Sequence, residues 1–150
     1  MVTVDRKLRR RIARRKEKVR RLIGEQEAKL VYEALNAAQD LAEEGISLEV
    51  IDPRTLVPLD RETIIRSVKK TGRLVVVDEA CQTCGAAAEI VALVTADKAA
   101  FSTLKAAPAR VCGLDVPIPF SPPMEKYAIP DKTKIVEAVR DVMRSAPRDQ

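Results

Sequence analysis

Two cysteines three positions apart form the most reactive motif of the chain. They lie in Cys81-Gln82-Thr83-Cys84, between an apolar run and a predicted helix. A helix N-terminus lowers the pKa of a nearby thiol, which is how thioredoxin-like redox sites activate their cysteines. Asp78 and Glu79 precede the motif, however, and their negative charges oppose a thiolate. The sequence therefore leaves two interpretations of Cys81 and Cys84, a redox pair and structural thiols, and favours the second.

The residue types that most metal and nucleotide sites require are scarce. The chain has no histidine, which excludes Ser-His and Cys-His nucleophilic pairs and the usual zinc and haem ligands. Zinc at the CxxC motif would need two further ligands, and Cys112 with a carboxylate is an unusual set. None of the five glycines are two positions apart, so no GxGxxG loop or P-loop is present. We predict no metal site and no self-contained nucleotide site.

Arg54 is a candidate for binding a partner or an anionic group. It follows the predicted strand 46–52, at the carboxyl end where α/β domains place their ligands. The alternative is that Arg54 pairs with a neighbouring carboxylate or with an adjoining subunit. Asp78 and Glu79 are not a catalytic acid pair, since adjacent strand residues point to opposite faces.

Positive charge is concentrated at the N-terminus. Residues 1–23 hold eleven basic and two acidic residues, a local charge of +9, which leaves 16 basic and 20 acidic residues, or −4, elsewhere. Nucleic-acid or anionic-surface binding through this basic helix is one functional hypothesis. The alternative is a solvated helix face, and no aromatic residue interleaves the basic ones for stacking on bases. We expect the rest of the chain not to bind nucleic acid.

The hydrophobic pattern predicts alternating helices and strands. Predicted helices cover residues 8–44, 61–71, 86–94 and 132–142, and predicted strands cover 46–52, 73–80 and 109–114. Asp60 and Asp131 are expected N-caps, and Gly45 and Gly72 expected C-terminal stops. Five prolines between residues 116 and 130 exclude a helix or a central strand there. This alternation predicts an α/β domain with a largely parallel sheet.

No apolar run approaches the length of a membrane span, so we expect a soluble protein without membrane contact. Three cysteines are an odd number in a chain of 150 residues that can fold without disulfides, and this fits a reducing compartment. The expected location is the cytoplasm, or the mitochondrial matrix if the source is eukaryotic.

Three long stretches together resemble one protein family. They read ALNAAQDLAEEGISLEVIDPRTLVPLD, TGRLVVVDEACQTCGAAAEIVALV and PARVCGLDVPIPFSPPMEKYAIPDKTKIVEAV. From Tyr32 to Met143 the chain resembles the C-terminal domain of the beta subunit of thiamine-diphosphate-dependent 2-oxo acid dehydrogenases, the pyruvate, branched-chain and acetoin group. The resemblance implies a three-layer α/β/α fold of the transketolase C-terminal type. It divides the chain into a basic helical arm (1–29), the domain (30–144) and a tail (145–150).

One departure from the family concerns the sheet. The family domain starts with an apolar strand that lies in the middle of the sheet, whereas the corresponding residues here read RRLIGEQEAK. We therefore expect a reduced sheet, unless Met1–Val4 or another chain supplies a strand. If the chain folds alone, residues 48–51 and 74–77 are expected to pair directly, with the N-terminal helix over the exposed face. Exposed sheet would otherwise recruit a second chain, giving a homodimer or an aggregation-prone monomer.

The other departure concerns catalysis. The family's N-terminal domain, which holds the carboxylate that activates the cofactor, has no counterpart in this sequence. The resemblance then implies an oxidoreductase family whose thiamine diphosphate and magnesium are not bound by this chain alone, so that it is non-catalytic by itself. The expected function is assembly with a second copy, with dehydrogenase alpha or beta subunits, or with the peripheral subunit-binding domain of the dihydrolipoyl acyltransferase. The candidate partner-binding residues are Arg54, Phe101, Lys105, Phe120 and Tyr127, with Phe101–Lys105 as a turn and Phe120 and Tyr127 as anchors in an extended connection.

Overall fold

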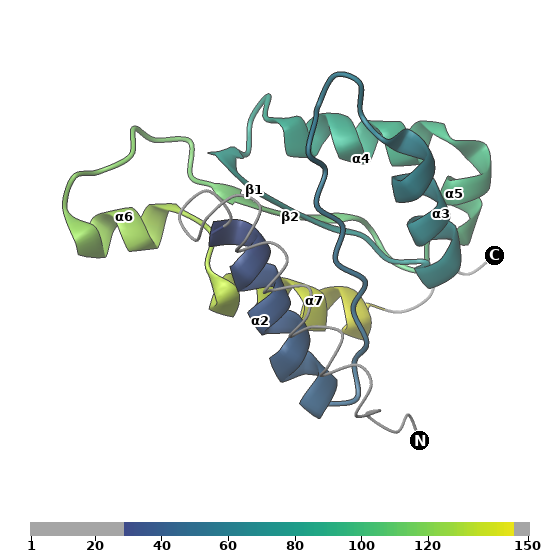
Figure 1. Ribbon diagram of the computed structural model, residues 1–150, viewed down its shortest axis with the longest axis horizontal. Helices are drawn as coiled ribbons and strands as arrows, with labels where there is room; N and C mark the ends of the chain where they lie inside the picture. The colour runs from purple at the N-terminus through teal and green to yellow at the C-terminus, as the bar shows by residue number, and fades with distance from the viewer. Residues whose placement is uncertain (1–28, 146–150) are drawn as a thin grey trace.

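Two parallel strands lie at the centre of the computed structural model, which describes residues 29–145 (Figure 1). The strands are Val75–Cys81 (β1) and Ala109–Gly113 (β2), and Val75 pairs with Ala109. β1 begins with three valines and β2 has Val111 at its centre, which suits strands covered on both faces. A parallel pair needs a long crossover, and two helices between the strands provide it: Ala86–Ala96 (α4) and Lys98–Thr103 (α5).

Helices cover both faces of this sheet and give three layers (Figure 1). On one face, Arg61–Thr71 (α3) packs with α4 and α5 around Val68, Val76 and Val94. On the other face, Lys29–Glu43 (α2) packs with Lys132–Arg144 (α7) around Leu41 and Val139. The described residues confirm the predicted three-layer α/β/α class with a reduced parallel sheet.

The predicted helix ends are confirmed by their caps. The Asp60 carboxylate accepts a hydrogen bond from the Thr63 N–H at 3.0 Å, and Asp131 accepts one from the Lys134 N–H at 2.9 Å. Gly72 ends α3 in the left-handed conformation, with a φ of +70°, and its N–H donates to the Val68 carbonyl at 2.7 Å. Of the predicted helix 8–44, the part from Lys29 to Glu43 is confirmed as α2, and residues 8–28 lie outside the described residues.

The prediction of a strand at residues 46–52 is wrong. The segment is extended, and its side chains alternate between half-buried and exposed, but it forms no ladder with another described strand. The expected pairing of residues 48–51 with 74–77 is also wrong, since the ladder that β1 forms with described residues is the one with β2. Of the N-terminal helix expected over the sheet, the described part, α2, packs against one face, and residues 8–28 lie outside the described range. Local alternation therefore predicted an extended segment correctly, but it did not predict whether a described strand would pair with it.

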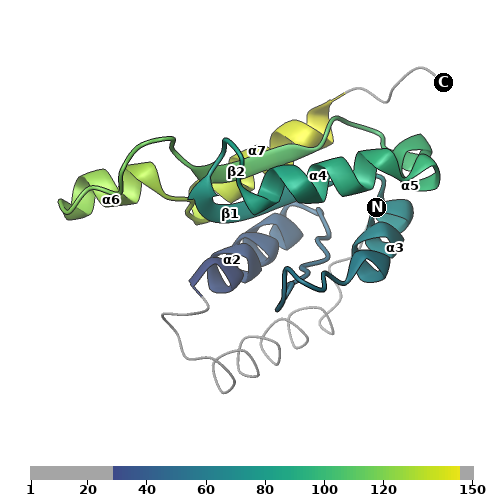
Figure 2. The same ribbon diagram turned by 90° about the horizontal axis from the view of Figure 1, so that it is seen from above.

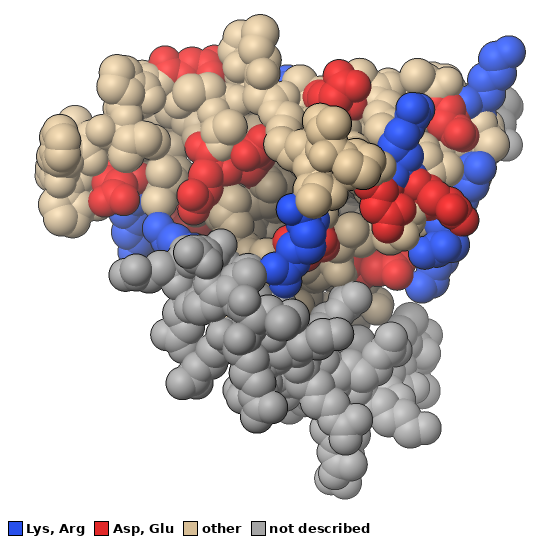
Figure 3. All heavy atoms as spheres, turned by 45° about the horizontal axis from the view of Figure 1, so that its top comes forward, with Lys and Arg blue, Asp and Glu red and all other residues tan. Residues whose placement is uncertain are grey.

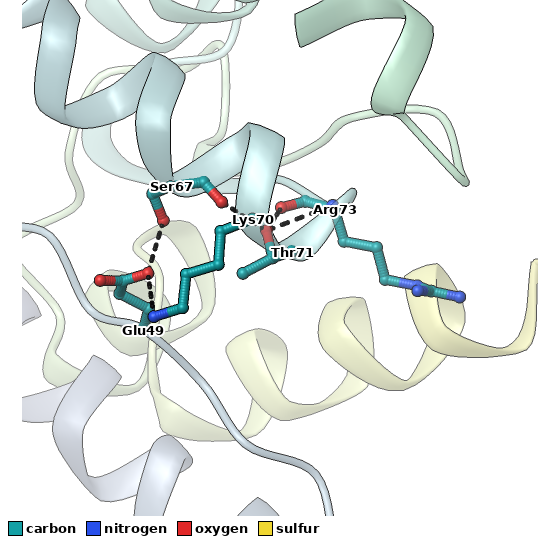
Figure 4. Close-up of polar contacts among 5 residues, drawn as sticks. All are labelled: Glu49, Ser67, Lys70, Thr71 and Arg73. Atoms are coloured by element: carbon teal, nitrogen blue, oxygen red, sulfur yellow. Dashed lines mark hydrogen bonds and ion pairs between the residues drawn. The ribbon is translucent and has the colours of Figure 1, made fainter.

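Side-chain contacts with described residues help to hold this extended segment in position. The Glu49 Oε2 atom accepts a hydrogen bond from the Ser67 hydroxyl at 3.0 Å and lies 3.5 Å from the Lys70 Nζ atom (Figure 4). On the side of the α2–α7 layer, Ile46 and Leu48 pack against the apolar cluster. Figure 2 shows the segment on the β1 side of the sheet, between α2 and α3.

Two loop predictions need correction. The proline-rich region contains a short helix, Pro122–Ala128 (α6), where a fully extended connection was expected. Its two prolines occupy the first helical positions, where a backbone N–H has no intrahelical partner and none is lost. Phe101 lies in helix α5, capped by Asp97, and the expected turn is restricted to the residues after Thr103.

Candidate functional site

The CxxC motif lies where β1 ends and α4 begins. Cys81 and Cys84 are both exposed free thiols, and Cys84 has a φ of +58°. The Asp78 carboxylate accepts hydrogen bonds from the Ala80 N–H at 3.0 Å and from the Ala87 N–H, in the first turn of α4, at 3.2 Å. A carboxylate therefore already neutralises the helix end that would have to stabilise a thiolate. This arrangement supports the structural interpretation of the two cysteines.

Further hydrogen bonds fix the loop between the cysteines. The Asp115 carboxylate accepts from the Thr83 hydroxyl at 2.6 Å and from the Thr83 N–H at 3.1 Å. These two hydrogen bonds lower the pKa of Asp115. The Arg110 guanidinium donates to the Gln82 carbonyl at 2.8 Å, from the neighbouring strand β2. The loop is thus tied to β2 on one side and to the segment after it on the other.

The third cysteine is expected to be the slowest of the three to react. Partial burial raises the pKa of the Cys112 thiol, and the charge of Asp78 raises it further. With iodoacetamide at pH 8, we expect Cys112 to be modified several-fold more slowly than Cys81 and Cys84, as followed by mass spectrometry of peptides. Unfolding in urea is the control and should remove the difference. Equal rates in the folded protein would contradict this placement of Cys112.

The same experiment tests the redox hypothesis. A redox pair requires Cys81 or Cys84 to react near neutral pH faster than a free cysteine does. Labelling that stays slow until alkaline pH would remove the redox role.

The described residues bring together no cluster of metal-ligating side chains. Across residues 29–145, no three Cys, Asp or Glu side chains lie close enough together to hold a metal ion. That this chain alone binds no thiamine diphosphate or magnesium stays a prediction.

The candidate partner-binding residues lie in three separate places. Arg54 lies beyond the extended segment, with its Nε atom 2.7 Å from Asp52 Oδ2. The distance makes this contact an ion pair. The Asp52 Oδ2 atom is buried and accepts no hydrogen bond, so the contact does not have hydrogen-bond geometry. Arg54 is thus paired with a neighbouring carboxylate. Phe101 lies on α5 and Lys105 just after it, at the end of the layers away from α6 (Figure 1).

Phe120 and Tyr127 lie together on a part of the chain that extends beyond the layers. We call residues 114–128 the apolar protrusion; it includes α6 at the far end of the molecule (Figures 1 and 2). Phe120 is fully exposed, and Tyr127 is 73 % exposed. The outer end of the protrusion carries few charged atoms in Figure 3. Its other exposed apolar residues are Leu114, Val116, Ile118 and Met124.

These four residues were not among the predicted site residues. The sequence feature that could have identified them is the number of large apolar residues in the proline-rich region. A proline-rich loop that carries several such residues cannot bury them all within itself.

The base of the protrusion is held firmly. The Leu114 N–H donates to the Ala128 carbonyl at 2.9 Å, closing the two ends of the protrusion on each other. The Lys134 ammonium group, at the start of α7, donates to the carbonyls of Tyr127 and Ile129, both at 2.6 Å. The same ammonium group lies 5.7 Å from the centre of the Tyr127 ring, a cation–π contact. The exposed side chains are therefore presented from a fixed base.

Two predictions concern other surfaces. Nucleic-acid or anionic-surface binding was assigned to the basic arm, which lies outside the described residues apart from Lys29, so that hypothesis stays a prediction. Among residues 29–145, no helix is long and apolar enough to cross a membrane.

Comparison with known proteins confirms the resemblance drawn from the sequence. The model of the family "Transketolase, C-terminal domain" matches residues 28–135. The beta subunit of acetoin:2,6-dichlorophenolindophenol oxidoreductase from Cupriavidus necator is 48% identical over 115 residues, 77% of this chain and 33% of the relative.

Pyruvate dehydrogenase relatives match to a similar degree. The pyruvate dehydrogenase E1 component subunit beta from Rickettsia felis is 48% identical over 109 residues, 73% of this chain and 33% of the relative. The mitochondrial subunit beta-1 from Arabidopsis thaliana is 49% identical over 111 residues, 74% of this chain and 30% of the relative. The chain spans about a third of the length of these relatives. It belongs to the transketolase C-terminal domain family, and over that length it is similar to beta subunits of pyruvate dehydrogenase and of acetoin:2,6-dichlorophenolindophenol oxidoreductase.

Proposed function

We propose that this chain is an assembly domain of a 2-oxo acid dehydrogenase beta subunit and that it binds a partner subunit through the apolar protrusion. The observation that carries the proposal is the group of exposed apolar side chains at residues 114–128, led by Phe120 and Tyr127. Burying one large apolar side chain contributes roughly 1.5–3 kcal/mol, so several of them together supply the driving force for an interface.

The partner proposed is a second copy of the chain. The relatives are named as beta subunits of multi-subunit enzymes, which supports association with a subunit of the same kind. Dehydrogenase alpha subunits are the other subunit partner that the family offers. In this proposal the chain acts in the compartment that holds those subunits, the cytoplasm of a bacterium or the mitochondrial matrix of a eukaryote.

The protrusion is a better partner surface than the two other candidate places. Arg54 is engaged by Asp52, and a single charged pair at a surface contributes little to binding. Lys105 is exposed and positively charged, which disfavours docking of a basic partner such as the acyltransferase's peripheral subunit-binding domain. Phe101 is only 44 % exposed, and it is separated from the protrusion by the length of the layers.

We also propose that this chain alone binds no thiamine diphosphate. The support for this proposal is that no three metal-binding side chains come together among residues 29–145. Isothermal titration of the chain with thiamine diphosphate and Mg²⁺ should show no binding heat, and turnover by the purified chain without other subunits would refute the proposal.

The assembly proposal is tested by light scattering of the full chain after size-exclusion chromatography. The wild-type chain is expected to dimerise as its concentration rises, and Phe120→Ser is expected to raise the dissociation constant at least tenfold. Phe101→Ser is the matched control, because it removes an exposed phenylalanine at the far end of the molecule and should leave the constant unchanged. A wild-type chain that stays monomeric, or a Phe120→Ser variant that dimerises as wild type does, contradicts the proposal.

A further inference from the structure

Ser121 lies on the apolar protrusion and is the one serine or threonine of the sequence that a proline follows. It stands between Phe120 and Pro122, and Pro119 two positions before it completes the sequence Pro-Phe-Ser-Pro. A serine with one proline directly after it and another two positions before it is the pattern that proline-directed protein kinases select. Use of this serine by such a kinase depends on the accessibility of its hydroxyl group and on the local backbone.

The Ser121 hydroxyl does not cap the helix that follows it. The residue is exposed and occupies the N-cap position of α6, with extended backbone angles (φ −71°, ψ 121°). A serine at this position ordinarily accepts a hydrogen bond from an N–H of the first turn, but Ser121 makes no such bond. The first two residues of α6 are Pro122 and Pro123, which have no N–H to donate. The capping role therefore does not account for this serine.

The backbone before and at Ser121 is accessible and irregular. Residues 117–121 belong to no described helix or strand. The rings of Pro117, Pro119 and Pro122 each restrict φ to about −65°, which favours an extended chain on both sides of the serine. Protein kinases bind the residues around an acceptor hydroxyl as an extended segment. Because this part of the chain extends beyond the layers (Figures 1 and 2), a kinase would reach the hydroxyl without any opening of the core.

We propose that Ser121 is a phosphorylation site for a proline-directed protein kinase and that its phosphate prevents assembly through the apolar protrusion. In the transfer, the Ser121 Oγ atom attacks the γ-phosphorus of ATP and the bond from that phosphorus to the β,γ-bridging oxygen breaks. ADP leaves, and the hydroxyl proton passes to a base of the kinase. This proposal rests on the proposed function of the protrusion and adds the regulation of the same surface.

The charge of the phosphate opposes burial of the protrusion. A phosphoserine carries about −1.5 to −2 charges near pH 7, and here it would directly follow Phe120, the fully exposed side chain of the proposed interface. Burial of that charge without a cation beside it is unfavourable. Glu125 adds negative charge in the first turn of α6, whereas Lys126 lies in the last turn. In a dimer of identical chains both protrusions would carry the phosphate and repel each other.

The first part of the test is phosphate incorporation into the full-length chain by a purified mitogen-activated protein kinase with ATP and Mg²⁺. Mass spectrometry of the chain and its peptides is expected to show one phosphate group, on Ser121. The Pro122→Ala variant keeps the hydroxyl but lacks the residue that the kinase selects, so its rate of incorporation should be at least tenfold lower. No incorporation, incorporation at another residue, or an unchanged rate in Pro122→Ala overturns the proposal.

The second part is light scattering of the phosphorylated chain. Its dimer dissociation constant is expected to be at least tenfold higher, and a phosphatase should restore the original value. Ser121→Ala treated with the same kinase is the matched control and should dimerise as the untreated wild-type chain does. A phosphorylated chain that dimerises equally well overturns the proposal. A chain that is monomeric even before treatment contradicts the proposed function and with it this regulation, whereas a dimeric chain that takes up no phosphate contradicts the regulation alone.

Discussion

Replacing Leu41 with alanine is expected to lower the free energy of unfolding by about 3 kcal/mol, within the range of roughly 2–5 kcal/mol for buried leucines. Leu41 is 0 % exposed and lies where α2 meets α7 and β2, in contact with the cluster that includes Val111 and Val139. Loss of its branched end leaves a cavity between helices that rest on only two described strands. Thermal denaturation followed by circular dichroism should show a midpoint roughly 10 °C lower.

Leu56→Ala is the control for this substitution. Leu56 is 59 % exposed in the loop after the extended segment, so the same chemical change there should alter stability by less than about 0.5 kcal/mol. Similar losses for the two variants would show that α2 is not packed against α7 as described.

Gly72→Ala is expected to lower the free energy of unfolding by about 2–4 kcal/mol, the second large effect. Gly72 has a φ of +70°, which costs a residue with a Cβ about 1–2 kcal/mol. A Cβ there would also lie 2.8 Å from the backbone carbonyl oxygen of Thr103, so the end of α5 would have to move. Urea denaturation should report this loss as a lower midpoint with an unchanged slope.

Gly45→Ala separates the two contributions. Gly45 has a φ of +81°, but a Cβ there would meet nothing within 4 Å, so this variant incurs the conformational cost alone. We expect it to lose about 1–2 kcal/mol, less than Gly72→Ala does. Equal losses of unfolding free energy at the two positions would mean that the close approach to the Thr103 carbonyl adds nothing to the destabilisation.

Features decided by short-range chemistry were predictable from the sequence. Asp60 and Asp131 cap helices because a carboxylate three residues before a free N–H needs no distant partner. The strand predicted at residues 46–52 pairs with no described strand, because a ladder depends on a neighbour and local alternation carries no information about where that neighbour lies. Helix α6 was missed because prolines disfavour the interior of a helix but not its first turn.

Only some residues of the candidate site were predictable from the sequence. Phe120 and Tyr127 were identified by residue type, and the structure places both on the protrusion. Ile118 and Met124 were missed because their exposure depends on how far the protrusion extends from the layers, which the sequence does not encode locally. Arg54 was predicted with an alternative, and the alternative, pairing with a nearby carboxylate, is the arrangement found.

The hydrogen bonds that Lys134 donates to the carbonyls of Tyr127 and Ile129 link partner recognition to folding. Lys134 belongs to α7, whose apolar residues form the core, so the protrusion keeps its shape only while α7 is packed. A partner that recognises this shape binds folded chains and ignores unfolded ones. By mass action, such a partner at 100 times its dissociation constant would add about 2.7 kcal/mol to the stability of the chain. Unpartnered copies would lack that increment and would be the first to unfold and be degraded.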